Sequence, residues 1–198
     1  MAKQSIAEIR KKEILSTFYE VAKVEGLENT SFAKIAQKLE IQPSLIVHYF
    51  KNRDELILAL IQYNLDQYKQ IFSIAHADDL SHQEHLNKVL DKLFSLDWNE
   101  LYDDGVYYSC YTLIFRHPEI KGKFKDLHLE LRSGLKTILE QCTKAGFLAI
   151  EDPATVAHQV YNLLDGTYYF VSMLDVKADQ EKYLQQSKTL AKKLIGLH

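Results

Sequence analysis

Residues 31–50 read SFAKIAQKLEIQPSLIVHYF, and this stretch decides the fold of the chain. Apolar residues recur at helical spacing from Phe32 onward, and Ser31 before them predicts an N-cap. Gln42 and Pro43 predict the start of a second helix, because a first helical position does not need the N–H that proline lacks. Helices this short are not stable alone, so we expect them to be mounted on a larger helical body.

The polar side chains of this helix pair are suited to phosphates and base edges. Two short helices joined by a tight turn, with such a face, are typical of a helix-turn-helix that binds DNA. We expect Ser44, Leu45, His48 and Tyr49 near the major groove, Lys51 and Arg53 on phosphates, and Ser31, Gln42 and Pro43 at the helix starts beside them. A structural helical hairpin without DNA is the alternative, and Tyr49 could partly be a packing residue.

The same residues resemble the TetR family of bacterial transcriptional repressors. The family pattern runs roughly T-x-x-x-I-A-x-x-x-G-V-S-x-x-x-L-Y-x-H-F-x-x-K-x-x-L. Matching or adjacent positions are Ser31, Ile35, Ala36, Ile41, Ile46, Tyr49, Phe50, Arg53 and Leu56. The chain departs from the pattern at the turn glycine, which is Glu40, at the turn serine (Gln42), at a tyrosine (Val47) and at a lysine (Arg53). A positive φ at Glu40 would cost about 1 kcal/mol relative to glycine.

Composition is that of an ordinary globular protein, with 46% hydrophobic and 26% charged residues among 198. Only 7 Gly and 3 Pro leave few helix breakers. No apolar run approaches the length of a membrane span and the amino end lacks a signal segment, so we expect a cytoplasmic protein. Residues 1–55 carry nine Lys and Arg against eight Asp and Glu, a net charge of about +1. The remainder carries about −4, which accounts for the negative net charge of −3.

The periodicity predicts an all-α chain of about nine helices, with a helix-turn-helix domain over 1–55 and a helical domain for effector binding and dimerisation over 56–198. Capping boxes at Ser5 and Ser81 start two of the helices. The other expected spans are 54–75, 100–116 (stopped by Pro118), 121–145 with Gly146 as its C-cap, one from Pro153, and 178–196.

The carboxyl end shows a second resemblance. Residues 151–174, EDPATVAHQVYNLLDGTYYFVSML, are similar to the BetI-like subgroup of the TetR family, which includes a choline-responsive repressor. The resemblance implies a homodimer through residues 153–196, whose last two helices pair with their copies. It also implies repression of an operator in double-stranded DNA, relieved by a small molecule that favours the conformation not bound to DNA.

Aromatic residues are concentrated where an effector pocket is expected. The candidates are Trp98, Tyr102, Asp104, Tyr107, Tyr108, Tyr111, Tyr168 and Tyr169, with Asp103 and Phe170 nearby. Stacked aromatic rings with a carboxylate suit an aromatic or cationic ligand. The alternative is a purely structural role, in which each of these residues belongs to the core or to the dimer interface.

Other functions have little support in the sequence. His82 and His85 could share a metal with His76 or Asp79, although solvated histidines are commoner. Cys110 and Cys142 lack a C-x-x-C partner. Asp165 and His158 could imitate an acid–base pair, but no nucleophile elbow, phosphate loop or HExxH occurs, so we expect neither an enzyme nor a cofactor or metal. The remaining alternative is an all-α adaptor that binds a protein partner.

Overall fold

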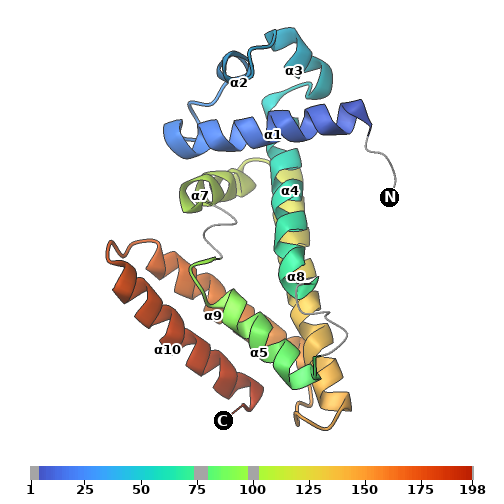
Figure 1. Cartoon of the computed structure of the whole chain (residues 1–198), viewed down its shortest axis with the longest axis vertical. Coiled ribbons are helices and arrows are strands. Elements are labelled where there is room, and N and C mark those ends of the chain that lie inside the picture. Colours follow the sequence, from blue (N-terminus) through green and yellow to red (C-terminus); the bar gives the residue numbers. More distant parts are fainter. Residues whose placement is uncertain (1–4, 74–79, 98–102, 198) are drawn as a thin grey trace. The chain divides into compact units, whose positions relative to one another are not determined.

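The computed structural model describes residues 5–73, 80–97 and 103–197, and it confirms an all-α chain (Figure 1). These residues form nine α-helices and one 3₁₀ turn, without a strand. The helices are α1 (Ile6–Glu25), α2 (Phe32–Lys38), α3 (Pro43–Tyr49), α4 (Arg53–Ser73), α5 (His82–Leu93), α7 (Asp104–Thr112), α8 (Pro118–Lys144), α9 (Pro153–Val171) and α10 (Lys177–Ile195), with the 3₁₀ turn η1 at Leu113–Phe115. The chain divides into two compact units, residues 1–64 with 102–126 and residues 65–101 with 127–198.

In the first unit, α1, α2 and α3 form the helical head, with α2 and α3 along one side of α1 (Figure 1). The capping box of Ser5 is confirmed, because the Ser5 hydroxyl accepts from the Glu8 N–H and the Glu8 carboxylate accepts from the Ser5 N–H. Ser31 caps α2 through the Lys34 N–H at 3.3 Å. Pro43 opens α3, as predicted.

The turn between α2 and α3 contains the one non-glycine residue with positive φ in the described chain, Glu40 at φ 55°. Its N–H donates to the Gln37 carbonyl at 3.2 Å, and the Ile41 N–H donates to the Ala36 carbonyl at 3.0 Å. These two bonds form a Schellman motif, which satisfies carbonyls at the end of α2. The left-handed conformation that the sequence left open at this position is therefore present, with glutamate in place of glycine.

The predicted limits around Pro118 were wrong. The helix expected over 100–116 ends at Thr112 and continues as the 3₁₀ turn η1, and Pro118 starts α8 instead of only stopping the helix before it. Proline suits both places, because it cannot continue a helix and yet needs no N–H at a first helical position. Gly146 follows the end of α8 with φ 74°, in the C-terminal role predicted for it.

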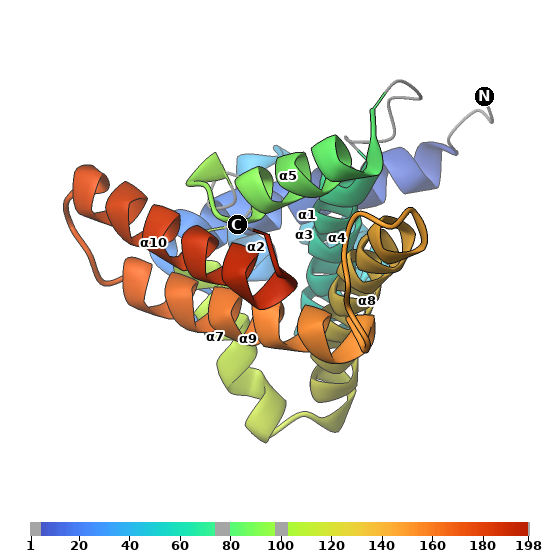
Figure 2. The same cartoon turned by 90° about the horizontal axis from the view of Figure 1, so that it is seen from below.

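The second unit contains α5, α9, α10 and the carboxyl part of α8. Ser81 and Glu84 form the predicted capping box of α5. Figures 1 and 2 show α9 and α10 side by side as a helical hairpin. The inward faces of the two helices are apolar, with Ala157, Val160 and Leu164 on α9 and Leu184 and Ala191 on α10. Within the described chain, no helix combines the length and the apolar character that a bilayer span requires.

Candidate DNA-binding surface and effector region

The short helix α3 presents one face to the core of the head and the opposite face to solvent. Ile46 and Phe50, four residues apart, are 0% and 2% exposed. Ser44, Val47 and His48 are exposed. Because these three stand at i, i+3 and i+4, they share one side of the helix. The head therefore offers a narrow polar face with one aliphatic side chain in its middle.

Two predicted groove residues lie at the margin of this face. Tyr49 is half-buried, and its ring meets that of His48 edge-on, with 5.0 Å between centroids. Leu45 is also half-buried, so it divides its surface between packing and solvent. Gln42 and Pro43 are exposed at the amino end of α3.

The two expected phosphate ligands differ in their surroundings. Lys51 is exposed, and its backbone N–H donates to the Glu55 carboxylate at 2.8 Å. Arg53 is also exposed, but its guanidinium donates to the Leu27 carbonyl at 2.5 Å. Arg53 therefore ties the start of α4 to the turn after α1, and it reaches that turn beside a surface hollow of about 390 Å³. The hollow is lined by Phe18, Glu28, Thr30, Ser31, Phe32, Ile35, Arg53 and Leu56.

Val47 is the residue of this face that the sequence-based site did not include. Its side chain is 49% exposed between two residues that were included. The signal was available, since its spacing from Ser44 places it on the outward side. An exposed valine is chemically suited to contact the methyl group of thymine.

The aromatic candidates for an effector site fall in both units. Tyr107, Tyr108 and Tyr111 lie on α7 in the first unit. The rings of Tyr107 and Tyr111 meet Phe124 of α8 edge-on, at 5.8 Å and 5.9 Å between centroids. Trp98 and Tyr102 lie outside the described residues.

The two carboxylates beside this aromatic cluster, Asp103 and Asp104, lie at the start of α7. Asp103 accepts from the Val106 N–H at 3.0 Å as the N-cap, and its own N–H donates to the Tyr19 hydroxyl at 2.6 Å. Burial, with the nearby charge of Asp103, raises the pKa of Asp104 above its ordinary value. A carboxylate in the first turn of a helix is already stabilised by the helix dipole. Asp103, as the N-cap of α7, therefore needs no ligand cation to account for its position.

Tyr168 and Tyr169 of α9 belong to the second unit and face different ways. The Tyr168 hydroxyl is within hydrogen-bonding distance of two carbonyls at the end of α5, those of Leu93 (2.9 Å) and Ser95 (2.7 Å). Tyr168 is 7% exposed, so it acts as a buried cap for a helix end. Tyr169 is 60% exposed on the outer side of α9.

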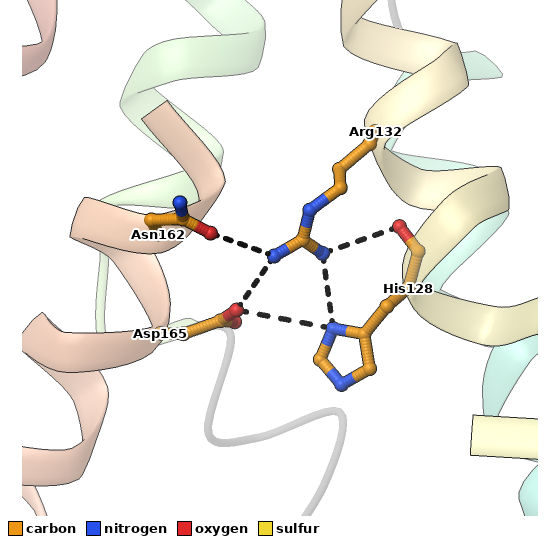
Figure 3. A network of polar contacts seen from close by, with 4 residues as sticks. All are labelled: His128, Arg132, Asn162 and Asp165. Atoms are coloured by element: carbon orange, nitrogen blue, oxygen red, sulfur yellow. Dashed lines mark hydrogen bonds and ion pairs between the residues drawn. The ribbon is translucent and has the colours of Figure 1, made fainter. Parts of the chain in front are cut away.

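A polar cluster that the sequence did not predict joins α8 to α9 (Figure 3). One terminal nitrogen of Arg132 lies 3.1 Å from the His128 Nδ1 and donates to the His128 carbonyl at 3.2 Å. The other donates to the Asn162 amide oxygen at 3.2 Å and to the Asp165 carboxylate at 3.0 Å. Asp165 thus pairs with Arg132 and not with His158, which removes the geometric basis of the acid–base pair weighed from the sequence.

Burial sets the protonation state of this cluster. Desolvation lowers the pKa of His128, the Asp165 charge opposes that shift, and the Arg132 charge adds to it. The guanidinium also lies over the ring of Tyr161, with 5.2 Å from Cζ to the centroid. Burial raises the pKa of Tyr161 far above its ordinary value, so its phenol stays protonated.

Two family models match the chain. The model for bacterial regulatory proteins of the tetR family matches residues 14–60, over the helical head. The model for the tetracyclin repressor-like C-terminal domain matches residues 81–197, more than half of the chain. The chain belongs to the TetR family. It is a transcriptional regulator with a DNA-binding helix-turn-helix and a ligand-binding domain.

Relatives of this TetR-family chain carry the same kind of function. The HTH-type transcriptional regulator PksA of Bacillus subtilis is 24% identical over 187 residues, 92% of this chain and 88% of that protein. The HTH-type transcriptional regulator BetI of Brucella anthropi is 22% identical, over 85% of this chain and 84% of that protein. These proteins are regulators and not enzymes.

Solved structures show the same fold. A TetR transcription regulator from Haloarcula marismortui superposes with a TM-score of 0.81 at 17% identity, covering 95% of this chain and 97% of that one. A regulator from Saccharomonospora viridis in complex with choline gives a TM-score of 0.76 at 16% identity, over 95% and 96% of the two chains. At these identities, the likeness concerns the fold of the TetR family and not the ligand.

The metal site weighed from the sequence finds no support in the part of the chain that the structure describes. His85 is buried in α5 at 5% exposure. Three or more potential ligands are not gathered anywhere among the described residues. His76 and Asp79 lie outside that part of the chain.

Proposed function

We propose that the outward face of α3 lies in the major groove of an operator, with Lys51 on a phosphate beside it. The carrying observation is the division of α3 into a buried side at Ile46 and an exposed side of Ser44, Val47 and His48. Hydroxyl and imidazole groups bind base edges, and an ammonium group binds phosphate. A regulator that works in this way acts in the cytoplasm, beside the DNA that it binds.

Gel-shift titrations against the DNA next to the gene test this proposal. Lys51→Ala should weaken binding to all sequences alike and reduce the salt dependence of the affinity by about one unit of slope. Ser44→Ala should instead change the preference among operator variants. Lys182→Ala, an exposed lysine of α10, is the matched control and should bind as the wild type does. Equal loss of affinity in Lys51→Ala and Lys182→Ala would overturn the assignment.

We also propose that the protein binds DNA as a homodimer formed through α9 and α10. Tyr169 and Phe170 of α9 and Met173, two residues beyond its end, are 60%, 42% and 56% exposed, and with Gly166 they form one stripe at spacings of three and four residues. A Cβ at Gly166 would meet nothing within 4 Å, so packing inside the chain does not explain this glycine. On α10, Leu190 is 48% exposed. A stripe of this kind is the face that two copies would bury.

Light scattering at micromolar concentration tests the dimer. Phe170→Asp should give a monomer that retains its helical circular dichroism spectrum, because it leaves the buried residues of α9 in place, although it removes a ring contact with Tyr183 of α10 at 4.8 Å between centroids. Leu129→Asp is the matched control, since Leu129 is a 46% exposed apolar residue of α8 outside the stripe. A wild-type protein that is monomeric, or a Phe170→Asp protein that stays dimeric, would contradict the proposal.

The control mechanism follows from these two proposals. Two recognition helices of a dimer reach successive major grooves only at one separation, about 34 Å or a multiple of it. A small molecule that binds a conformation with another separation therefore releases both half-sites and relieves repression. The alternative adaptor function would require binding to a protein partner without binding to the adjacent DNA.

A further inference from the structure

The hydroxyl of Tyr161 is a buried polar group that the rest of the described chain leaves unsatisfied. Tyr161 is 1% exposed, and its Oη finds no hydrogen-bond partner among the described residues. Buried polar side chains are nearly always hydrogen-bonded, so a phenol in this state indicates a partner from outside the polypeptide. The guanidinium of Arg132, which lies over the same ring, shows what kind of partner would be stable there.

An incoming anion can replace Asp165 as the counter-ion of Arg132. The side chain of Arg132 is only 13% exposed, whereas that of its counter-ion Asp165 is 46% exposed. Asp165 makes one hydrogen bond to the guanidinium, although a carboxylate can make two to an arginine. If another carboxylate took this place, Asp165 could return to water at little cost and the buried positive charge would remain neutralised.

The same geometry favours an anion over other ligand charges. A cationic group would meet the buried charge of Arg132, and a neutral ligand could satisfy the Tyr161 hydroxyl but could not replace Asp165 as the counter-ion. His128 adds no competing positive charge near neutral pH, because burial lowers its pKa. An anion that accepts hydrogen bonds from a phenol and a guanidinium fits all of these groups.

We propose that Tyr161 and Arg132 bind the carboxylate of a small organic acid, which displaces Asp165 from the guanidinium. The Tyr161 hydroxyl donates to one carboxylate oxygen and Arg132 to the other. This inference rests on the proposed function, in which the acid is the effector. Asp165 and Asn162 both belong to α9, so exchanging Asp165 for the acid removes one of the polar links between α8 and the proposed dimer helix.

Thermal unfolding with defined probes tests the site without DNA. Benzoate and hexanoate are compared with benzamide, hexanamide, benzylamine and hexylamine. At least one of the two acids should raise the melting temperature of the wild-type protein in a saturable way, and its amide and amine should not. Tyr161→Phe should bind that acid at least tenfold more weakly, while its unliganded melting temperature is equal to or above that of the wild type. Tyr169→Phe, an exposed tyrosine of the same helix, is the control and should respond as the wild type does.

Several results would overturn the assignment. These are a silent response to both acids, an equal response to amides or amines, or a Tyr161→Phe protein that binds the acid as well as the wild type. Because Arg132→Gln could unfold the unit, the isosteric Tyr161→Phe variant carries the test. Gel shifts with the same acid distinguish failure of the effector role from failure of the DNA-binding proposal. Acid binding without any change in DNA affinity refutes the effector role, whereas failure of Lys51→Ala to weaken DNA binding refutes the DNA-binding proposal alone.

Discussion

Arg53 donates a hydrogen bond from its guanidinium to the main-chain carbonyl of Leu27, at 2.5 Å and across 26 residues of sequence. Leu27 lies in the turn after α1 and is 3% exposed, so this bond fixes the turn that leads into the helix-turn-helix. Arg53 was assigned to phosphate from its position in the sequence. In the structure it also holds the head together, which lysine with its single ammonium group would do less well.

Arg53→Ala should therefore lower both stability and DNA affinity. Loss of a charge-assisted hydrogen bond at an exposed side chain should cost about 1 kcal/mol or less of the free energy of unfolding. Lys51→Ala is the matched change, because it removes a nearby charge without a side-chain bond to the turn, and it should affect DNA binding only. Urea unfolding measures the first effect and gel shifts the second. An Arg53→Ala protein as stable as Lys51→Ala would refute the structural role.

Glu40→Gly should stabilise the protein. Glu40 holds φ at 55°, where glycine has no steric cost, although glycine also gains freedom in the unfolded chain. The balance should favour glycine by about 0.5 kcal/mol. Glu20→Gly, at an exposed position inside α1, is the control and should destabilise by about 1 kcal/mol. If both changes destabilise the protein in urea unfolding, the positive φ of Glu40 does not carry a steric cost that glycine relieves.

Local signals in the sequence located the helices well, because caps act within four residues. Ser5, Ser81 and Pro43 each mark a helix start that the structure contains. Pro118 misled because proline suits both the end of one helix and the start of the next. The links that shape the candidate sites, Arg53 to Leu27 and Arg132 to Asp165, span 26 and 33 residues. Such bonds depend on tertiary packing, and periodicity or capping gives no sign of them.

Two buried tyrosines of α9 should respond in opposite ways to loss of the hydroxyl. Tyr168→Phe leaves the Leu93 and Ser95 carbonyls at the end of α5 without their donor, so it should destabilise by about 1–2 kcal/mol. Tyr161→Phe removes a hydroxyl that makes no bond within the described chain, so it should be neutral or stabilising. Urea unfolding of the two unliganded variants measures the difference. Equal destabilisation would mean that the Tyr161 hydroxyl has a partner in the free protein.

Protonation of His128 should destabilise the fold as the pH falls. Burial lowers its pKa below the ordinary value of 6.5, the Asp165 charge opposes this shift, and the Arg132 charge adds to it. In the folded protein, the neutral ring can accept from the Arg132 guanidinium at Nδ1. Between the two pKa values the unfolded chain binds one more proton at this residue, so its contribution to stability is present above pH 6.5 and is lost as the pH falls toward the folded pKa.

His128→Gln isolates that contribution, because glutamine can accept the same hydrogen bond and does not titrate. Between pH 7.5 and 5.5, the free energy of unfolding of the wild type should fall more steeply than that of His128→Gln. His158→Gln, which removes an exposed imidazole of α9, is the matched control and should keep more of the wild-type slope than His128→Gln does. Because protonated His128 repels Arg132 and can no longer accept its hydrogen bond at Nδ1, the contact between these two side chains should be lost over the same pH range. Parallel curves for the wild type and His128→Gln would show that His128 titrates alike in the folded and unfolded chains.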